Sequence, residues 1–167
     1  LDWWPVCLGF NNLEPPFDDP EVRRAVNHAI DREQLVKIGW QGAGTSSHLP
    51  LPNFPPIRNY TDGIQDLIDK YEIGVYDPAK TAEILQRKGW SKDGEGFWSK
   101  GGERLTMVVD IFGIFNDIAP VLVAQLKQAG VDASFRLTSD TFTRMAQGTA
   151  RAYMMGNGGS VRDPYFT

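Results

Sequence analysis

The chain has 167 residues, of which 41% are hydrophobic and 23% charged, and its formal net charge is −4. This size and composition suit one globular domain with a core of its own. The modest negative charge gives no indication of a nucleic-acid or membrane-surface partner, and no run approaches the ~20 apolar residues of a membrane-spanning helix. The single cysteine, Cys7, lies in an apolar run and is interpreted as a buried structural thiol.

The first third of the chain predicts a strand, a helix and a long loop. Residues 3–10 are apolar and aromatic, which favours a buried strand. Asp19 followed by Pro20 is typical of a helix start, because the carboxylate caps free N–H groups and proline needs none. We expect this helix over residues 20–38 and a long, proline-rich loop over residues 39–60.

The middle of the chain predicts two helices and a hairpin. Residues 62–71 form a short helix candidate, and Asp77 with Pro78 repeats the helix-start signal, with Gly89 ending that helix. The glycine-rich turns at 93–97 and 100–102 are expected to flank a short hairpin.

The last third predicts a strand–helix–strand unit. Apolar residues alternate over 104–112 and again over 131–137, and a helix that Asn116 caps is expected between them. This order predicts two parallel strands with a right-handed crossover. Asp140 is expected to cap a further helix that runs through residue 147. Residues 153–155 are expected to form a final short strand.

Five segments resemble one family when they are taken in order. Residues 15–33 read PPFDDPEVRRAVNHAIDRE, which resembles the signature of extracytoplasmic solute-binding proteins of ABC importers, the oligopeptide, dipeptide and nickel type (family 5). The further segments are YDPAKTAEIL at 76–85, KGW at 88–90, LKQAGV at 126–131 and the stretch from MMG to DP at 154–164. Together they cover most of the chain.

The resemblance implies an α/β fold, namely one lobe of a type II periplasmic-binding-protein fold with a central mixed sheet flanked by helices. Residues 1–167 are expected to form a single domain, the C-terminal ligand-binding lobe of a longer two-lobe protein. The sequence has no initiator Met and no signal peptide at its start, and we interpret this as a sign that the chain is a piece of a longer protein.

The same resemblance implies the substrate-binding component of an ABC transporter. It would capture a peptide-like or other small polar solute between two lobes and deliver it to permease subunits in the membrane. We expect a periplasmic protein, or an extracellular one anchored to the membrane, that is a monomer. No cofactor, metal or catalytic residue is expected.

By resemblance, the loop after the last strand faces the solute. Peptide-binding members carry there a Trp and, three residues later, an Asp that pairs with the amino terminus of the peptide; the matching positions are Asn157 and Ser160. Ser160 offers only a hydroxyl, whereas Arg162 adds a cation with a fork of donors. With Gly158 in the same loop, these residues favour a solute that presents hydroxyl or anionic groups. The alternative is that the loop only shapes the pocket.

A second candidate rim is the start of the preceding helix, at Thr141, Phe142 and Arg144. By resemblance a Trp often lies near Thr141, and its absence points away from ordinary peptides. The two histidines, His28 and His48, lack carboxylate or thiol partners at metal-ligand spacing, so neither indicates a metal site.

Two other classes remain as alternatives. A small α/β hydrolase would need the Gly-x-Ser-x-Gly motif of a nucleophile elbow, and residues 158–160 match this motif only in part. A nucleotide-binding module would need a phosphate-binding loop, and no complete pattern is present. A sensor domain that uses the same lobe for ligand binding fits the residues as well as a transport component does.

Overall fold

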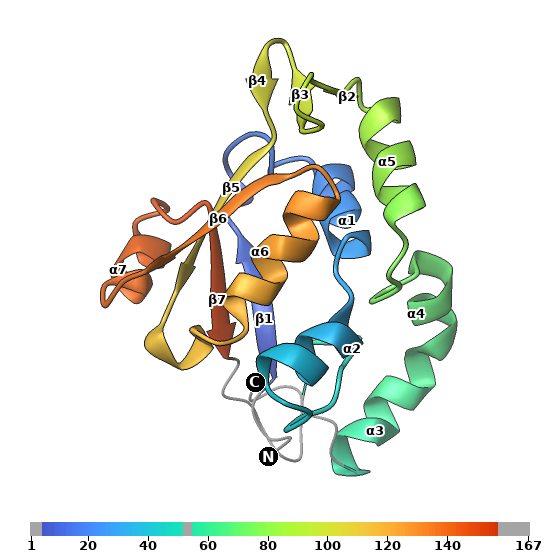
Figure 1. Cartoon of the computed structure of the whole chain (residues 1–167). Helices are drawn as coiled ribbons and strands as arrows, with labels where there is room; N and C mark the ends of the chain where they lie inside the picture. The colour runs from blue at the N-terminus through green and yellow to red at the C-terminus, as the bar shows by residue number, and fades with distance from the viewer. Residues whose placement is uncertain (1–4, 52–54, 157–167) are drawn as a thin grey trace.

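The computed structural model describes residues 5–51 and 55–156, which form a mixed α/β domain (Figure 1). The strands are β1 (Val6–Phe10), β2 (Ser91–Lys92), β3 (Trp98–Lys100), β4 (Glu103–Arg104), β5 (Thr106–Ile111), β6 (Asp132–Leu137) and β7 (Ala152–Gly156). The α-helices are α1 (Pro20–His28), α2 (Arg32–Gln34), α3 (Pro55–Thr61), α4 (Gln65–Tyr71), α5 (Pro78–Arg87), α6 (Ala119–Gln128) and α7 (Thr141–Ala146). Shorter helical turns are η1 (Leu35–Gly39), η2 (Asp62–Ile64) and η3 (Gly113–Phe115).

A four-stranded mixed sheet organises the domain, in the order β1-β7-β5-β6. Strand β5 pairs in parallel with both β6 and β7, and β1 pairs antiparallel with β7. The predicted parallel pairing of the strands at 104–112 and 131–137 is therefore confirmed. Gly9 of β1 lies opposite Tyr153 of β7, whose ring occupies the space where a side chain at Gly9 would stand.

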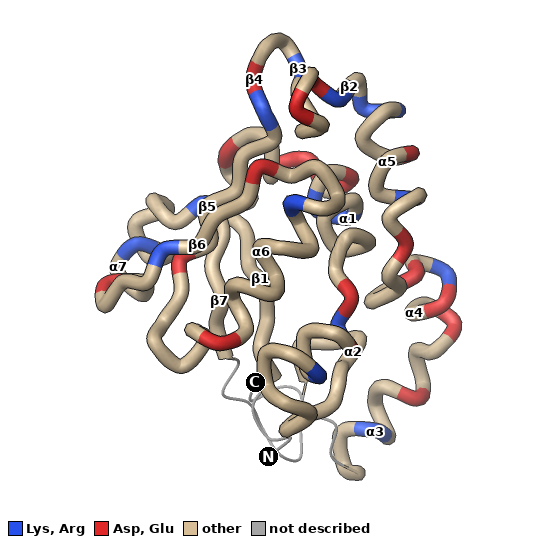
Figure 2. Tube along the Cα trace, in the orientation of Figure 1, with Lys and Arg blue, Asp and Glu red and all other residues tan. Residues whose placement is uncertain are grey.

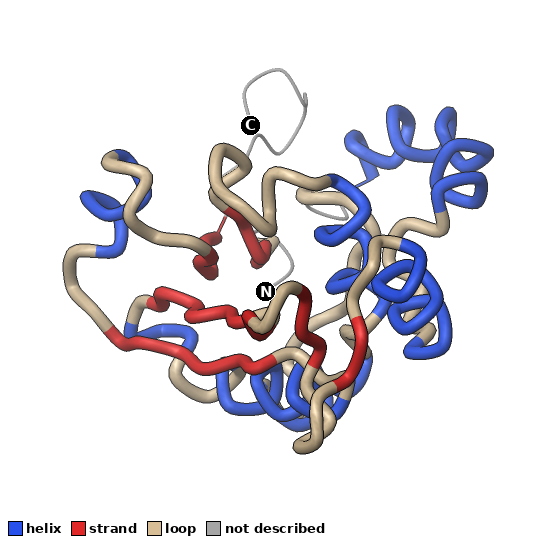
Figure 3. Tube along the Cα trace, turned by 90° about the horizontal axis from the view of Figure 1, so that it is seen from above, coloured by secondary structure: helices blue, strands red, loops and turns tan. Residues whose placement is uncertain are grey.

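The core lies between this sheet and the helices on one side of it. Met107, Val109 and Ile111 of β5 are fully buried, as are residues of α6, α1 and α5 in the same apolar cluster. Seen from above, most of the helices gather along one side of the strands (Figure 3). The predicted hairpin is also confirmed: strands β2, β3 and β4 form a small antiparallel sheet.

The first helix begins as predicted but ends earlier. The Asp19 carboxylate accepts a hydrogen bond from the Glu21 N–H at 2.9 Å, and Pro20 is the first helical residue. The prediction of one helix through residue 38 is wrong, because α1 ends at His28. Asp31 then accepts from the Gln34 N–H at 3.0 Å and starts a new helix, so its side chain competes with continuation of the first one.

Other boundaries also differ from the prediction. The loop expected over 39–60 contains the start of α3, and the helix expected over 62–71 is divided into η2 and α4. Asn116 does not cap a helix, since α6 begins at Ala119 after the turn η3. The expected strand at 3–10 is described only from Val6 onward.

The two other aspartates that were predicted to cap helices, Asp77 and Asp140, behave differently from each other. Asp77 caps α5 as predicted, accepting from the N–H groups of Ala79 and Lys80 at 3.0 and 3.2 Å. Asp140 precedes α7 but makes no capping hydrogen bond, because its carboxylate accepts instead from the Thr138 hydroxyl.

We predict that Asp77→Ala lowers the free energy of unfolding by about 1 kcal/mol, because two N–H groups at the start of α5 lose their acceptor. Urea unfolding measures this, with Asp77→Ser as the matched control that keeps an acceptor at the cap. Equal loss of stability in the two variants would show that the cap does not stabilise α5.

A second prediction concerns the pH dependence of Asp19. A hydrogen bond from Lys88, whose Nζ lies 2.5 Å from the carboxylate, is the main cause that lowers the pKa of Asp19. A lowered folded pKa stabilises the fold above the unfolded pKa of about 3.9, and this contribution disappears as the pH falls through the folded value. The stability gap between the wild type and Asp19→Asn should therefore be larger at about pH 7 than at about pH 3. A gap that does not change with pH would contradict this.

Candidate functional site

The carboxyl edge of the sheet is where the candidate site is assembled. Because β5, β6 and β7 are parallel, their carboxyl ends meet at this edge, and β1 begins there, with Val6 opposite Gly156. The turn η3 follows β5, helix α7 follows β6, and β7 ends at the same edge with Gly156 (Figure 1). Loops at the carboxyl ends of parallel strands are the usual ligand-binding position in open α/β sheets.

An exposed apolar surface lies at this edge. We call it the edge patch; its exposed members are Ile114, Leu137 and Phe142, which keep 59%, 56% and 63% of their surface accessible. The Phe142 ring packs on that of Phe112, with 4.7 Å between the ring centroids. Large apolar side chains grouped on a surface are typical of a binding face.

A cavity of about 820 Å³ adjoins the edge patch. It lies between β1, the α1–η1 region, the loop at 39–51 and the start of α6, and Ile114 of the edge patch is among its lining residues. Its interior is mostly apolar, with Leu8, Ile30 and Leu122 in the wall. Small-molecule sites are typically cavities of this size with a few polar groups.

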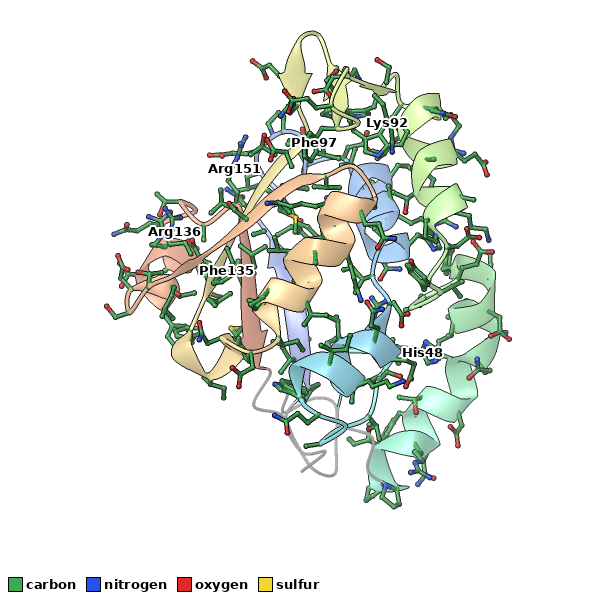
Figure 4. All side chains as sticks on the ribbon, in the orientation of Figure 1. His48, Lys92, Phe97, Phe135, Arg136 and Arg151 are labelled. Carbon is green, nitrogen blue, oxygen red and sulfur yellow. The ribbon has the colours of Figure 1, made fainter. Side chains whose placement is uncertain are left out.

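The polar groups of the cavity are held by contacts to the chain. The Arg32 guanidinium donates to the Asn27 side chain and to the carbonyls of Ile30 and Gly74, and burial lowers the pKa of Arg32. His48 Nδ1 lies 2.9 Å from a backbone carbonyl, which can only accept, so this nitrogen carries the proton. Figure 4 shows His48 beside α2.

Cys7 also lines the cavity and is half-buried. Burial raises the pKa of its thiol, which therefore stays protonated and unreactive at neutral pH. This agrees with the interpretation of Cys7 as a structural thiol.

A buried carboxylate anchors the neighbouring helix α7. Asp110 is completely buried on β5, and its Oδ1 accepts from Arg136 Nε at 2.7 Å and Arg136 Nη2 at 2.6 Å. Its Oδ2 accepts from Arg144 Nε at 2.7 Å, and Arg144 also donates to the Thr149 carbonyl. Figure 4 places Arg136 beside α7. The two arginines thus fasten α7, with Phe142, to the sheet.

The predicted rim residues of α7 have different surroundings. Phe142 is exposed in the edge patch. Thr141 is fully buried, with its hydroxyl 3.2 Å from the Thr138 carbonyl, and the Arg144 side chain is about a quarter exposed and bound to Asp110. The other predicted contacts, Asn157, Gly158, Ser160 and Arg162, lie outside the described residues.

The sequence analysis missed Asp110, Phe112 and Ile114. The signal for Asp110 was present, since a carboxylate between apolar residues of a buried strand needs a charged partner, and Arg136 stands opposite it in register. Phe112 is the last residue of the strand predicted over 104–112, and Ile114 follows it, at the carboxyl end where site residues are expected.

Within the described ranges, no group of three or more metal-ligating side chains is placed to hold an ion. No helix in the described part of the chain combines the length and the apolar character needed to cross a membrane.

We predict that Asp110→Asn destabilises the protein by about 2–3 kcal/mol, because two guanidinium groups lose a buried, charge-assisted acceptor. Arg136→Gln should cost about 1 kcal/mol or less, since 46% of the Arg136 side chain remains in water. Thermal or urea unfolding tests this order, with exposed Asp117→Asn as the control. Equal effects of Asp110→Asn and Asp117→Asn would contradict the anchoring role.

Residues 2–167 match the family described as bacterial extracellular solute-binding proteins, family 5 Middle. Among curated proteins, the heme-binding protein A of Haemophilus influenzae is 39% identical over 92 residues, which are 54% of this chain and 15% of that protein. The oligopeptide-binding protein AppA of Bacillus subtilis is 29% identical over 136 residues, which are 79% of this chain and 24% of that protein.

Solved structures share the fold. NikA from Brucella suis, in complex with Fe(III)-EDTA, superposes with a TM-score of 0.80 at 22% identity, covering 97% of this chain and 32% of that one. Bacillus subtilis AppA, in complex with a nonapeptide, superposes with a TM-score of 0.74 at 22% identity, over 96% of this chain and 32% of that one. The chain thus spans about a third of these structures and less of the curated relatives. The expected type II periplasmic-binding-protein fold is confirmed, and the chain belongs to the bacterial extracellular solute-binding proteins of family 5.

Proposed function

We propose that the chain is part of the substrate-binding component of an ABC importer, in which the carboxyl edge of the sheet forms one wall of the solute site. Residues 1–167 act as a single domain, the C-terminal ligand-binding lobe of a longer two-lobe protein. The family match over residues 2–167 supports this, as do curated relatives named for binding oligopeptides, dipeptides and glutathione.

The observation that carries the proposal is the meeting of the edge patch and the large cavity at one place. Ile114 belongs to both, and the exposed ring of Phe142 packs on Phe112, two residues before Ile114. Exposed aromatic and aliphatic side chains next to a cavity can bury the apolar part of a solute. Strand β7 also ends at this edge, at Gly156.

The solute is proposed to be peptide-like or another small polar molecule that presents hydroxyl or anionic groups to residues 157–162. By the resemblance described above, Ser160 takes the position where peptide-binding members carry a carboxylate, and Arg162 would supply a positive charge nearby. On α7, Phe142 is the proposed solute contact, and its exposed ring packs against the apolar part of the solute, whereas Thr141 is buried and Arg144 mainly holds α7 in position.

The partners proposed for the whole protein are permease subunits of the importer, and its location is the periplasm or the outer surface of the cell. We propose that it acts as a monomer that binds without catalysis. Purified protein that converts any bound solute into a different product would contradict this.

The first experiment identifies the solute. Native mass spectrometry of the full-length protein, purified under mild conditions, should reveal a bound small molecule, which calorimetry with the same compound then confirms. A panel of dipeptides, glutathione and N-acetylated peptides separates recognition of a free amino group from recognition of hydroxyl or anionic groups.

We predict that Phe142→Ala weakens solute binding about tenfold, because an aromatic ring is lost from the wall of the site. Leu13→Ala is the matched control, since Leu13 is 88% exposed in the loop after β1, at the opposite edge of the sheet. If both variants bind the solute like the wild type, the edge patch is not a wall of the site.

We also predict that Arg162→Ala weakens binding of the native solute roughly tenfold to a hundredfold, as expected for a lost charged hydrogen bond. Ser160→Asp should favour solutes with a free amino group. Unchanged affinity in Arg162→Ala, together with a native solute that is an ordinary peptide, would contradict the proposed specificity and leave the transport role intact.

A further inference from the structure

A second, smaller hollow of about 110 Å³ lies where α1 packs against α5, away from the carboxyl edge of the sheet. Its lining comes from α1, α5 and the residue that follows α4. The lining residues are Arg24, His28, Glu72, Lys80, Glu83, Ile84 and Arg87. We call it the α1–α5 hollow. Its surroundings carry many charged residues of both signs (Figure 2).

His28 presents an unpaired nitrogen there. The residue is completely buried, and its Nδ1 lies 2.9 Å from the Val75 carbonyl. A carbonyl only accepts, so Nδ1 carries the proton, and Nε2 of the neutral ring is left with a lone pair. This Nε2 is buried and has no hydrogen-bond partner in the described part of the chain.

Arg24 presents an unpaired donor on the same helix face, one turn before His28. Its terminal nitrogens lie 3.7 Å from Glu21 and 3.6 Å from Glu72, but its Nε is buried and has no partner among the described residues. A buried polar atom without a hydrogen-bond partner destabilises the fold, because it has lost its contact with water. Both atoms belong to residues that line the same hollow, so we expect an occupant of the hollow to be their partner.

The other charged groups around the hollow are already paired. Glu72 accepts from Lys80, while Arg87 pairs with Glu21 at 2.5 Å and with Glu83 at 3.5 Å. The charged groups that line the hollow with His28 come from α1, from α5 and from the residue that follows α4. They are Arg24, Glu72, Lys80, Glu83 and Arg87. The hydrogen bond from Lys80 is the main cause that lowers the pKa of Glu72, so this carboxylate stays ionised and committed to Lys80.

We propose that the α1–α5 hollow is an anion site controlled by the protonation of His28. With a neutral ring, the hollow needs a group that accepts from Arg24 Nε–H and donates to His28 Nε2, which is the chemistry of water. With a protonated ring, two donors converge, and the matching occupant is a small oxyanion such as a carboxylate or inorganic phosphate. A cavity of about 110 Å³ has room for either occupant.

Protonated His28 has one competing partner, because Glu72 lies near enough for the charge of His28 to contribute to its lowered pKa. If Glu72 takes the new N–H, the ring responds to pH but not to added anion. The response to anion therefore separates the two outcomes.

The experiment follows the ring signals of the histidines by NMR across a pH titration of the protein, with and without inorganic phosphate at constant ionic strength. Phosphate that binds the protonated form moves the titration midpoint of His28 to higher pH. His48 is the internal control, since its Nδ1 also lies 2.9 Å from a carbonyl but the residue is exposed and away from the hollow. We expect a shift for His28 and none for His48.

Two variants complete the test. Arg24→Lys keeps the positive charge but removes the Nε donor, and it should abolish the phosphate-induced shift, whereas Lys127→Gln on α6 should preserve it. Phosphate should also raise the melting temperature of the wild type at about pH 5.5 more than at about pH 8. The proposal is overturned if phosphate does not change the titration midpoint of His28, or if the phosphate-induced shift persists in Arg24→Lys. Either result means that the hollow binds water or an adventitious ion only.

Discussion

Strand β5 is the element on which the rest of the domain depends, because it pairs with strands on both of its edges and carries different chemistry on its two faces. Met107, Val109 and Ile111 point into the core and are fully buried, so β5 holds α6 and the neighbouring strands together through the hydrophobic effect. On its other face, Asp110 binds two arginines. The residues just after β5 then form part of the edge patch. Residues 107–114 thus contain core residues, the buried carboxylate that anchors α7 and a member of the candidate site.

This arrangement connects packing with the proposed function. A solute wall works when its side chains are held in place before the solute arrives, because ordering them during binding costs free energy. The Phe142 ring rests on Phe112, and its helix is fastened through Arg144 to the buried carboxylate of Asp110. The loop side of the cavity is less regular, and there Arg32 and His48 are held by backbone carbonyls instead. We therefore expect the proposed wall to be held most firmly where the parallel strands end.

Local signals allowed much of the fold to be predicted. Asp19–Pro20 and Asp77–Pro78 gave the correct starts of α1 and α5, and alternation gave β5 and β6 with their parallel pairing. Where the predicted helix boundaries or caps were wrong, the side chain concerned makes a different hydrogen bond from the one that the local pattern indicates. Asp31 ends the first helix by capping the next one, and Asp140 accepts from Thr138 instead of capping α7. Phe135 and Leu137 alternate like core residues, yet 36% and 56% of their surfaces stay exposed. The site was harder to predict, since the edge patch joins residues from η3, β6 and α7 that only the sheet topology brings together.

The central claim is that the carboxyl edge of the sheet contacts the solute. Hydrogen–deuterium exchange of the full-length protein, with and without its native solute, tests this most directly, because it reports the edge and the opposite end of the sheet in one measurement. The account predicts slower exchange on solute binding at residues 112–117 and 141–144, with no change in the β2–β3–β4 hairpin at the other end of β5. Protection that appears in the hairpin, or that is absent from both edge segments at saturating solute, would contradict it.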